Sequence, residues 1–235
     1  MKIVKHIPNT ITCLNLLSGC ISILFTCNNH ILWASAMVFV AAVFDFFDGF
    51  AARLLNAKSP IGGELDSLSD VVSFGVAPSF ILAWFLGQTG IGWWIYDVNI
   101  FPMLAFILAA FAAVRLAKFN LDTRQTTSFI GLPVPAVGLF IASLPFMLFK
   151  IGSDSSLYNF VVNPYFLLAI VAIFSWLMIS EVPFFSFKIK TLKFKENILR
   201  YFVVIFAIVA VIVLKSVALP FVFLFYILLS VICYK

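Results

Sequence analysis

Long apolar stretches recur along the whole chain, and short polar or basic segments separate them. A helix that crosses a membrane needs about 20 mainly apolar residues. Eight stretches fit this requirement, at about residues 10–28, 31–55, 64–87, 101–119, 133–150, 163–181, 199–214 and 217–234. Only 11% of the 235 residues are charged, whereas a soluble domain carries about 25%. The sequence therefore predicts an all-α, polytopic transmembrane helical bundle, within a single integral-membrane domain that spans residues 1–235.

The basic residues are divided unequally between the two sides of this predicted bundle. With the N-terminus in the cytoplasm, thirteen of the fifteen lie on the inner side: Lys2, Lys5, Arg53, Lys58, Arg115, Lys118, Arg124, Lys188, Lys190, Lys193, Lys195, Arg200 and Lys235. Lys150 and Lys215 lie on the outer side. Cytoplasmic loops of membrane proteins are enriched in Lys and Arg, so we predict that both termini are cytoplasmic. The net charge is +5. We expect the basic residues to set the membrane topology and to contact anionic lipid head groups, and not to bind nucleic acid.

Four aspartates lie near the cytoplasmic ends of the second and third predicted spans. Asp45 and Asp48 are three residues apart, and Asp66 and Asp70 are four apart, so each pair shares one helical face. The connection between the spans is short, which makes the two helices antiparallel neighbours. Four converging carboxylates would repel one another unless a cation neutralised them. Oxygen ligands suit Mg²⁺ or Mn²⁺, so the sequence predicts a site for two such ions that bind phosphates.

Small and basic residues accompany the aspartates. Gly49 and Ala52 leave room for a bulky group to approach the second span, and Arg53 can contact a phosphate or brace a carboxylate. Gly62 and Gly63 precede the third predicted span, where they relax the chain. A two-metal site surrounded in this way suits phosphoryl transfer, because it orients the donor and offsets charge on the attacking and leaving oxygens.

The complete pattern resembles the signature of the CDP-alcohol phosphatidyltransferase family. It reads Asp45, two residues, Asp48-Gly49, two residues, Ala52-Arg53, eight residues, Gly62, three residues, Asp66, three residues, Asp70. The resemblance implies that the four aspartates hold two metal ions, with Asp66 and Asp70 as the catalytic pair and Asp70 as general base. It also implies that Gly49, Ala52, Arg53 and Gly62 bind CDP, that CMP is released, and that the protein is a homodimer.

Further segments resemble the members of this family that transfer a phosphatidyl group from CDP-diacylglycerol to L-serine. They are Ile7-Pro-Asn-Thr-Ile-Thr-Cys-Leu-Asn15, Glu64-Leu-Asp-Ser-Leu-Ser-Asp-Val-Val-Ser-Phe-Gly-Val-Ala-Pro-Ser79, Arg115-Leu-Ala-Lys-Phe-Asn120 and Phe129-Ile-Gly-Leu-Pro-Val-Pro135. The expected catalytic core covers about residues 1–182, followed by two extra helices at about 199–234. The expected location is the inner membrane of a prokaryote, with the active site facing the cytoplasm and membrane lipids around the helices.

The acceptor site is less strongly specified. Arg115 and Lys118 can meet the carboxylate of serine, or instead serve topology or bind donor phosphates. Ser73 and Ser79 either line the acceptor pocket or bond to backbone carbonyls four residues back. Asn9, Thr12 and Asn15 share one face at the start of the first span. Asn9 and Thr12 are predicted to contact the nucleotide, with helix capping by Asn9 or Thr10 as the alternative for this segment.

Two alternative functions remain open at this stage. The first is the same chemistry with glycerol 3-phosphate or an inositol phosphate as acceptor, which would require more cations around the pocket. The second is an ion-coupled membrane transporter, whose acidic residues would lie near the midplane of the bilayer. The aspartates of this chain instead cluster near one predicted surface, and no internal repeat is evident.

Overall fold

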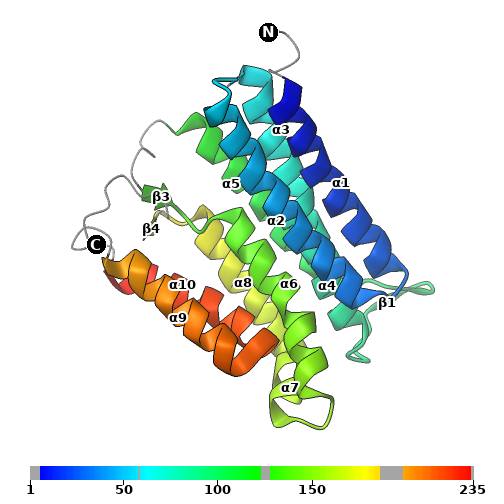
Figure 1. Cartoon of the computed structure of the whole chain (residues 1–235). Coiled ribbons are helices and arrows are strands. Elements are labelled where there is room, and N and C mark those ends of the chain that lie inside the picture. The colour runs from blue at the N-terminus through cyan, green and yellow to red at the C-terminus, as the bar shows by residue number, and fades with distance from the viewer. Residues whose placement is uncertain (1–5, 58, 123–127, 186–197, 234–235) are drawn as a thin grey trace.

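A computed structural model describes residues 6–57, 59–122, 128–185 and 198–233. Within these ranges the chain is almost entirely helical (Figure 1). The elements are α1 (Ile7–Cys27), α2 (Ile31–Leu54), α3 (Pro60–Asp70), the π-helical segment η2 (Val71–Val76), α4 (Ala77–Gly87), β1 (Trp94–Ile95), β2 (Val98–Asn99), the 3-10 segment η3 (Phe101–Phe106), α5 (Ile107–Leu121), β3 (Ser128–Ile130), α6 (Val134–Ile151), α7 (Ser156–Val161), α8 (Pro164–Ile179), β4 (Pro183–Phe185), α9 (Ile198–Leu214), the 3-10 turn η5 (Lys215–Val217) and α10 (Ala218–Cys233).

The continuous helix formed by α3, η2 and α4 lies at the centre of the bundle. It packs against α1 on one side and against α5 and α6 on others, and Phe74, Ile81 and Leu82 within it are fully buried. The helices α1 and α2 form a long antiparallel pair along its side, and the start of α1, the end of α2 and α3 lie together at one end of the molecule (Figure 1). This arrangement places the aspartates of α2 and α3 side by side.

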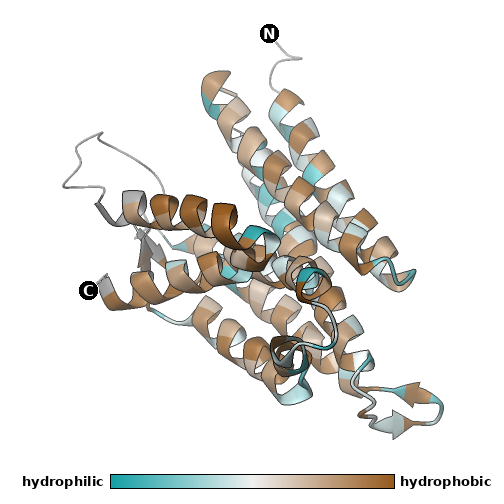
Figure 2. Ribbon diagram, turned by 60° about the horizontal axis from the view of Figure 1, so that its bottom comes forward, coloured by the Kyte–Doolittle hydropathy of each residue, from teal (hydrophilic) through white to brown (hydrophobic). Residues whose placement is uncertain are grey.

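Apolar side chains cover the outer surface of the bundle. Leu24, Phe46, Trp176 and Ile212 are each more than 60% exposed, and Figure 2 shows hydrophobic residues along the length of the helices. Large contiguous apolar surfaces are rare on soluble monomers, whereas hydrocarbon chains solvate them in a bilayer. The expected polytopic helical membrane protein is therefore confirmed.

Not all of the eight expected spans form helices that meet the length and composition of a membrane crossing. In the described ranges, six helical stretches are long and apolar enough to cross: Ile7–Cys27, Ile31–Leu54, Pro60–Gly87, Phe101–Leu121, Val134–Ile151 and Phe202–Ile232. The last of these reverses at Lys215, where φ is +53°, so that α9 and α10 pack side by side (Figure 1). The helices α8, α9 and α10 have 16, 17 and 16 residues, or about 25 Å each. This is shorter than the hydrocarbon core of about 30 Å, so eight full crossings remain a prediction.

The two lysines assigned to the outer side lie at the same end of the bundle. Ser216, next to Lys215, donates a hydrogen bond from its hydroxyl to the carbonyl of Phe146 at 3.3 Å, and Phe146 lies one turn before Lys150 in α6. Arg53 lies at the opposite end, in the last turn of α2. These three residues therefore lie at the two ends to which the sequence assigned them, while the orientation of the bundle stays a prediction.

The third span begins earlier than predicted. Ser59 caps α3 by accepting the Gly62 N–H at 3.1 Å, and Pro60 occupies the first helical position. Both residues favour a helix start. The expectation that Gly62 and Gly63 lie before the helix is therefore wrong, because both lie within α3.

Two short antiparallel pairs of strands were not part of the all-α prediction. β1 pairs with β2 in a hairpin after α4. β3 pairs with β4, with Phe129 opposite Phe184, and so joins the segment after α5 to the segment after α8.

Candidate active site

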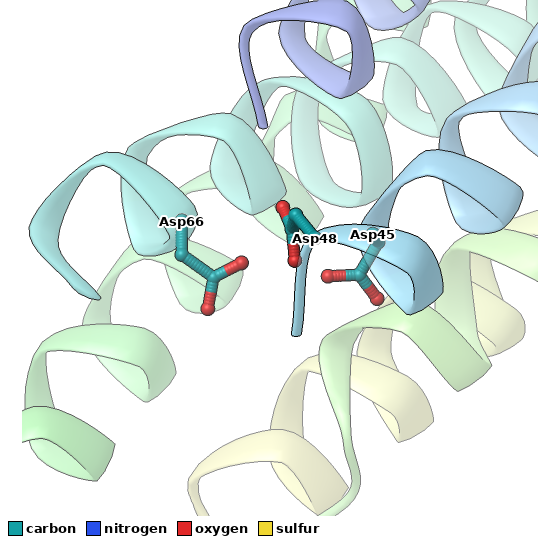
Figure 3. A group of neighbouring side chains, drawn as sticks. All are labelled: Asp45, Asp48 and Asp66. Carbon is teal, nitrogen blue, oxygen red and sulfur yellow. The ribbon is translucent and has the colours of Figure 1, made fainter. Parts of the chain in front are cut away.

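Three aspartates from two helices converge at the end of the bundle where α2 meets α3. Figure 3 shows Asp45 and Asp48 of α2 and Asp66 of α3 with their carboxylates directed toward one another. One carboxylate oxygen from each lies within 4.8 Å of the other two. The three-residue spacing in α2 directs both of its aspartates toward α3, as the sequence predicts.

The buried oxygens of this cluster suit a divalent cation. Asp48 Oδ2, Asp66 Oδ1 and the neighbouring Asn15 Oδ1 are buried and have no hydrogen-bond partner among the described residues. A buried acceptor without a partner costs about 1–3 kcal/mol, and more when it is charged. Three carboxylates in contact add mutual repulsion. A hard cation such as Mg²⁺ or Mn²⁺ would satisfy the carboxylate oxygens of the cluster, so the residues present fit the metal that the sequence predicted.

The fourth aspartate, Asp70, lies deeper and is not part of this three-residue group. It is 7% exposed, and its Oδ1 accepts a hydrogen bond of 3.3 Å from the amide of Asn15 in α1. It lies within electrostatic reach of Asp45, Asp66 and Asp48 and of the guanidinium of Arg115 in α5. Asp70 is thus held by Asn15 and is influenced electrostatically by both the other aspartates and Arg115.

Hydrogen bonds between α1 and the third span fix the depth of Asp70. The hydroxyl of Ser69 donates to the carbonyl of Thr12 at 3.2 Å, and that of Ser73 donates to the carbonyl of Asn15 at 2.9 Å. A Cβ on Gly19 would lie 2.8 Å from the Cα of Ser73, so the glycine permits this close approach. The π-helical segment begins directly after Asp70, and such segments are frequent at functional sites.

A cavity of about 240 Å³ opens beside the carboxylates. It is lined by Pro8, Asn9, Thr12, Asp48, Gly49, Ala52, Ala57, Ser59, Gly62, Gly63 and Asp66. The predicted nucleotide-binding residues Asn9, Thr12, Gly49, Ala52 and Gly62 are all included. Arg53 lies on the adjacent exposed surface of α2, where its Nε donates to the carbonyl of Gly49 at 2.9 Å.

A second cavity of about 420 Å³ lies between α5 and the end of α8. Its lining comprises Arg115, Lys118, Leu121, Asp122, Ile130, Met178, Ile179, Ser180 and Glu181. Arg115 is 5% exposed, and its guanidinium carbon lies 4.9 Å from the centre of the Phe119 ring. Because Arg115 both lines this cavity and lies within electrostatic reach of Asp70, it connects the second cavity to the aspartates.

The structure does not place Ser73 and Ser79, the two candidate acceptor-binding serines, in either cavity. Ser79 donates its hydroxyl to the carbonyl of Gly75 at 2.8 Å, which is the backbone alternative, and the hydroxyl of Ser73 is committed to α1 as described above. Both serines are fully buried and line neither cavity. This geometry gives no support to an acceptor-binding role for either of them. Asn15 contacts Asp70 instead of the nucleotide cavity.

Sequence reasoning missed two residues of the site. Ser59 lines the first cavity and caps α3, and its position directly before Pro60 was the signal that could have revealed it. Glu181 lines the second cavity, although a charged residue at the end of a predicted span is by default a solvated helix end. No local pattern distinguishes a residue that lines the cavity from one exposed to solvent at this position, because the difference depends on where α5 packs.

These features define a helical membrane protein with a carboxylate cluster between two cavities, suited to hold a divalent metal. Residues 5–187 match the CDP-alcohol phosphatidyltransferase family in sequence. The chain belongs to this family. It is 34% identical over 190 residues to the CDP-diacylglycerol--serine O-phosphatidyltransferase of Bacillus subtilis, covering 78% of this chain and 92% of that protein. The protein of the same name from Mycobacterium leprae is 31% identical over 97% of this chain and 72% of its own length. The protein of the same name from Helicobacter pylori strain 26695 is 30% identical, over 84% of this chain and 78% of its own length.

Proposed function

We propose that the protein transfers the phosphatidyl group of CDP-diacylglycerol to the hydroxyl of L-serine and releases CMP. The observation that carries this proposal is the position of Asp70 and Arg115, between the carboxylate cluster at the first cavity and the second cavity. The relatives named above catalyse, by their names, transfer to serine. The donor occupies the first cavity and the acceptor the second, so that the two reactants meet at Asp70.

The residues of the first cavity bind and orient the donor. Gly49 and Ala52 leave space beside α2 for the cytidine and its phosphates, while Asn9 and Thr12 of α1 line the opposite wall. Asp45, Asp48, Asp66 and Asp70 would hold two ions of Mg²⁺ or Mn²⁺. When bound, these ions offset the negative charge that develops on the attacking and leaving oxygens. Placing the donor in this way lowers the entropic part of the barrier.

The transfer is a direct displacement. Arg115 binds the carboxylate of serine through its planar fork of N–H donors, and Lys118 adds positive charge at the mouth of the cavity. Asp70 accepts the proton of the serine hydroxyl. The serine oxygen forms a bond to the phosphorus that carries diacylglycerol, the bond from that phosphorus to CMP breaks, and phosphatidylserine and CMP are the products.

Acceptor competition tests the proposal directly. Purified protein with CDP-diacylglycerol and Mn²⁺ is offered radiolabelled serine, glycerol 3-phosphate or inositol phosphate, and label in the lipid phase is counted. We expect label from serine alone, with its KM raised about tenfold in Arg115→Lys, because lysine cannot form a bidentate pair. Label from glycerol 3-phosphate or inositol phosphate in place of serine would assign the acceptor differently, and absence of label from all three would contradict the reaction.

A substitution at Gly62 tests the donor cavity. A Cβ at this position would lie 3.0 Å from Asn9 Oδ1 and 3.0 Å from Ser59 Oγ, so Gly62→Ala narrows the cavity at its floor. We expect the KM for CDP-diacylglycerol to rise about tenfold, since overpacking costs about 1–3 kcal/mol, while the KM for serine stays unchanged. The matched control is Gly87→Ala at the far end of the same span, where the nearest heavy atom would lie at 3.8 Å. An equal effect of both variants would refute this placement of the donor.

The location and assembly complete the proposal. The protein resides in the inner membrane of a prokaryote, with its active site and both termini on the cytoplasmic side, because the basic residues favour that orientation. Residues 1–182 form the catalytic core, with a C-terminal helical extension. The family resemblance supports a homodimer, which cross-linking in native membranes would detect.

A further inference from the structure

One buried polar side chain of α1 is held beside Asp70 by the packing of α1 against the third span. Asn15 is fully buried, and α1 lies alongside α3 and the π-helical segment η2 (Figure 1). The hydroxyl of Ser73 donates to the backbone carbonyl of Asn15 at 2.9 Å, and that of Ser69 donates to the carbonyl of Thr12 at 3.2 Å. Because Ser69 and Ser73 flank Asp70 in the sequence, these bonds hold α1 in register with Asp70.

The side chain of Asn15 makes a direct hydrogen bond to this aspartate. Its Nδ2 donates to Asp70 Oδ1 at 3.3 Å, and both side chains are buried. An ionised carboxylate only accepts hydrogen bonds, so the nitrogen of the amide faces Asp70. The distance slightly exceeds the usual range of about 2.7–3.2 Å, as is common for catalytic hydrogen bonds before the substrate binds.

The other half of the amide distinguishes Asn15 from an ordinary buried polar residue. Its Oδ1 is buried and has no hydrogen-bond partner among the described residues, which destabilises the folded protein. Ser18, one turn further along the same buried face, instead donates its hydroxyl to the carbonyl of Leu14 at 2.8 Å, within α1 itself. An apolar side chain could fill the position of Asn15 without an unsatisfied oxygen. The hydrogen bond to Asp70 is therefore the interaction that accounts for an asparagine here.

A proton acceptor benefits from a bond of this kind. A general base must present one oxygen to the hydroxyl at hydrogen-bonding distance, and such bases are commonly oriented by a third group. The terminal torsion of an aspartate is broad, so an unrestrained carboxylate would turn its plane away from the acceptor. A donor bound to Oδ1 restricts that plane and leaves Oδ2 for the proton.

We propose that Asn15 is a positioning residue for Asp70, which it orients so that Oδ2 takes the proton from the acceptor hydroxyl. The proposal rests on the proposed function of Asp70 as general base and deepens it, because it adds a residue of α1 to the proton-transfer step. Asn15 does not touch the reacting atoms, and it lines neither cavity. It contributes to the rate of transfer and not to the binding of either substrate.

The test is the steady-state kinetics of Asn15→Ala in the full-length protein at saturating Mn²⁺. We expect kcat to fall about 10- to 100-fold, the usual effect of losing a residue that orients a functional group, while the KM values for serine and CDP-diacylglycerol stay within about twofold of wild type. The matched control is Ser18→Ala, which removes a polar group from the same buried face of α1; its kinetics should equal those of wild type. If Asn15→Ala does not fold, Asn15→Leu poses the same question, because leucine fills the space without an N–H donor.

A double-mutant cycle separates positioning from general packing. If Asn15 acts through Asp70, the double variant Asn15→Ala with Asp70→Asn should have nearly the kcat of Asp70→Asn alone. Multiplied losses of kcat would show that the two residues act independently, and a rise in both KM values at unchanged kcat would indicate a packing role; each overturns the inference. A wild-type protein that incorporates no serine, or full turnover in Asp70→Asn, would instead defeat the proposed function. Wild-type kcat in Asn15→Ala, beside an inactive Asp70→Asn, defeats this inference alone.

Discussion

Replacing Asp66 with asparagine is expected to reduce serine incorporation by about 10³-fold or more and to weaken Mn²⁺ binding. Asp66 provides the only carboxylate of α3 in the three-residue cluster, and its Oδ1 is buried without a hydrogen-bond partner among the described residues. Asparagine keeps the size of the side chain but removes its charge. Substitution of groups that stabilise charge in a transition state typically costs about 10²–10³-fold, and loss of a metal ligand adds the loss of the ion. Activity assays with titrated Mn²⁺ and Mn²⁺ paramagnetic resonance measure both effects.

The control for this variant lies two residues earlier in the same helix. Glu64 is exposed and is not a member of the cluster, so Glu64→Gln removes an equal charge without removing a ligand. We expect this variant to keep wild-type activity and Mn²⁺ affinity. Wild-type Mn²⁺ affinity in Asp66→Asn, or full activity of the native protein in excess chelator, would disprove the metal site. An equal loss of activity in both variants would indicate that the overall negative charge of this surface, and not a metal ligand, supports the activity.

The convergence of the aspartates was predictable because it depends on local geometry. Residues spaced by three or four positions share a helical face, and a five-residue connection from Leu55 to Ser59 keeps the end of α2 close to the start of α3. Local spacing also accounts for the donor cavity, since Gly49 and Ala52 lie within about one turn of Asp48 and Gly62 lies about one turn before Asp66. The helix α3 begins before the two glycines because Ser59 caps it and Pro60 occupies its first position.

The acceptor side was less predictable because it is assembled from distant segments. Arg115 lies in α5 and Glu181 follows the end of α8, and no short-range periodicity relates these two distant residues. The pairing of β3 with β4 likewise depends on how α5 and α8 dock. The hydroxyls of Ser69 and Ser73 illustrate the same limit, because their acceptors are carbonyls of α1 more than 50 residues earlier.

Asp70 should respond to substitution differently from Asp66, because its environment differs. It lies outside the three-residue group, 7% exposed, between the amide of Asn15 and the guanidinium of Arg115. We expect Asp70→Asn to lower kcat by about 10²–10⁴-fold, the usual contribution of a general base, and to leave the binding of CDP-diacylglycerol largely intact. Equilibrium binding of radiolabelled donor, measured beside the rate of serine incorporation, separates these two quantities.

A charge-matched control strengthens this comparison. Asp97 lies between the strands of the β1–β2 hairpin, away from both cavities, and Asp97→Asn should have the rate and donor affinity of wild type. Wild-type turnover in Asp70→Asn would remove this residue as the proton acceptor, because an amide cannot accept the serine proton in its place. Loss of donor binding together with turnover would assign Asp70 to the donor site instead. Intact donor binding with loss of turnover requires a group that acts only once both substrates are bound, and a buried carboxylate within electrostatic reach of Arg115 is suited to that step.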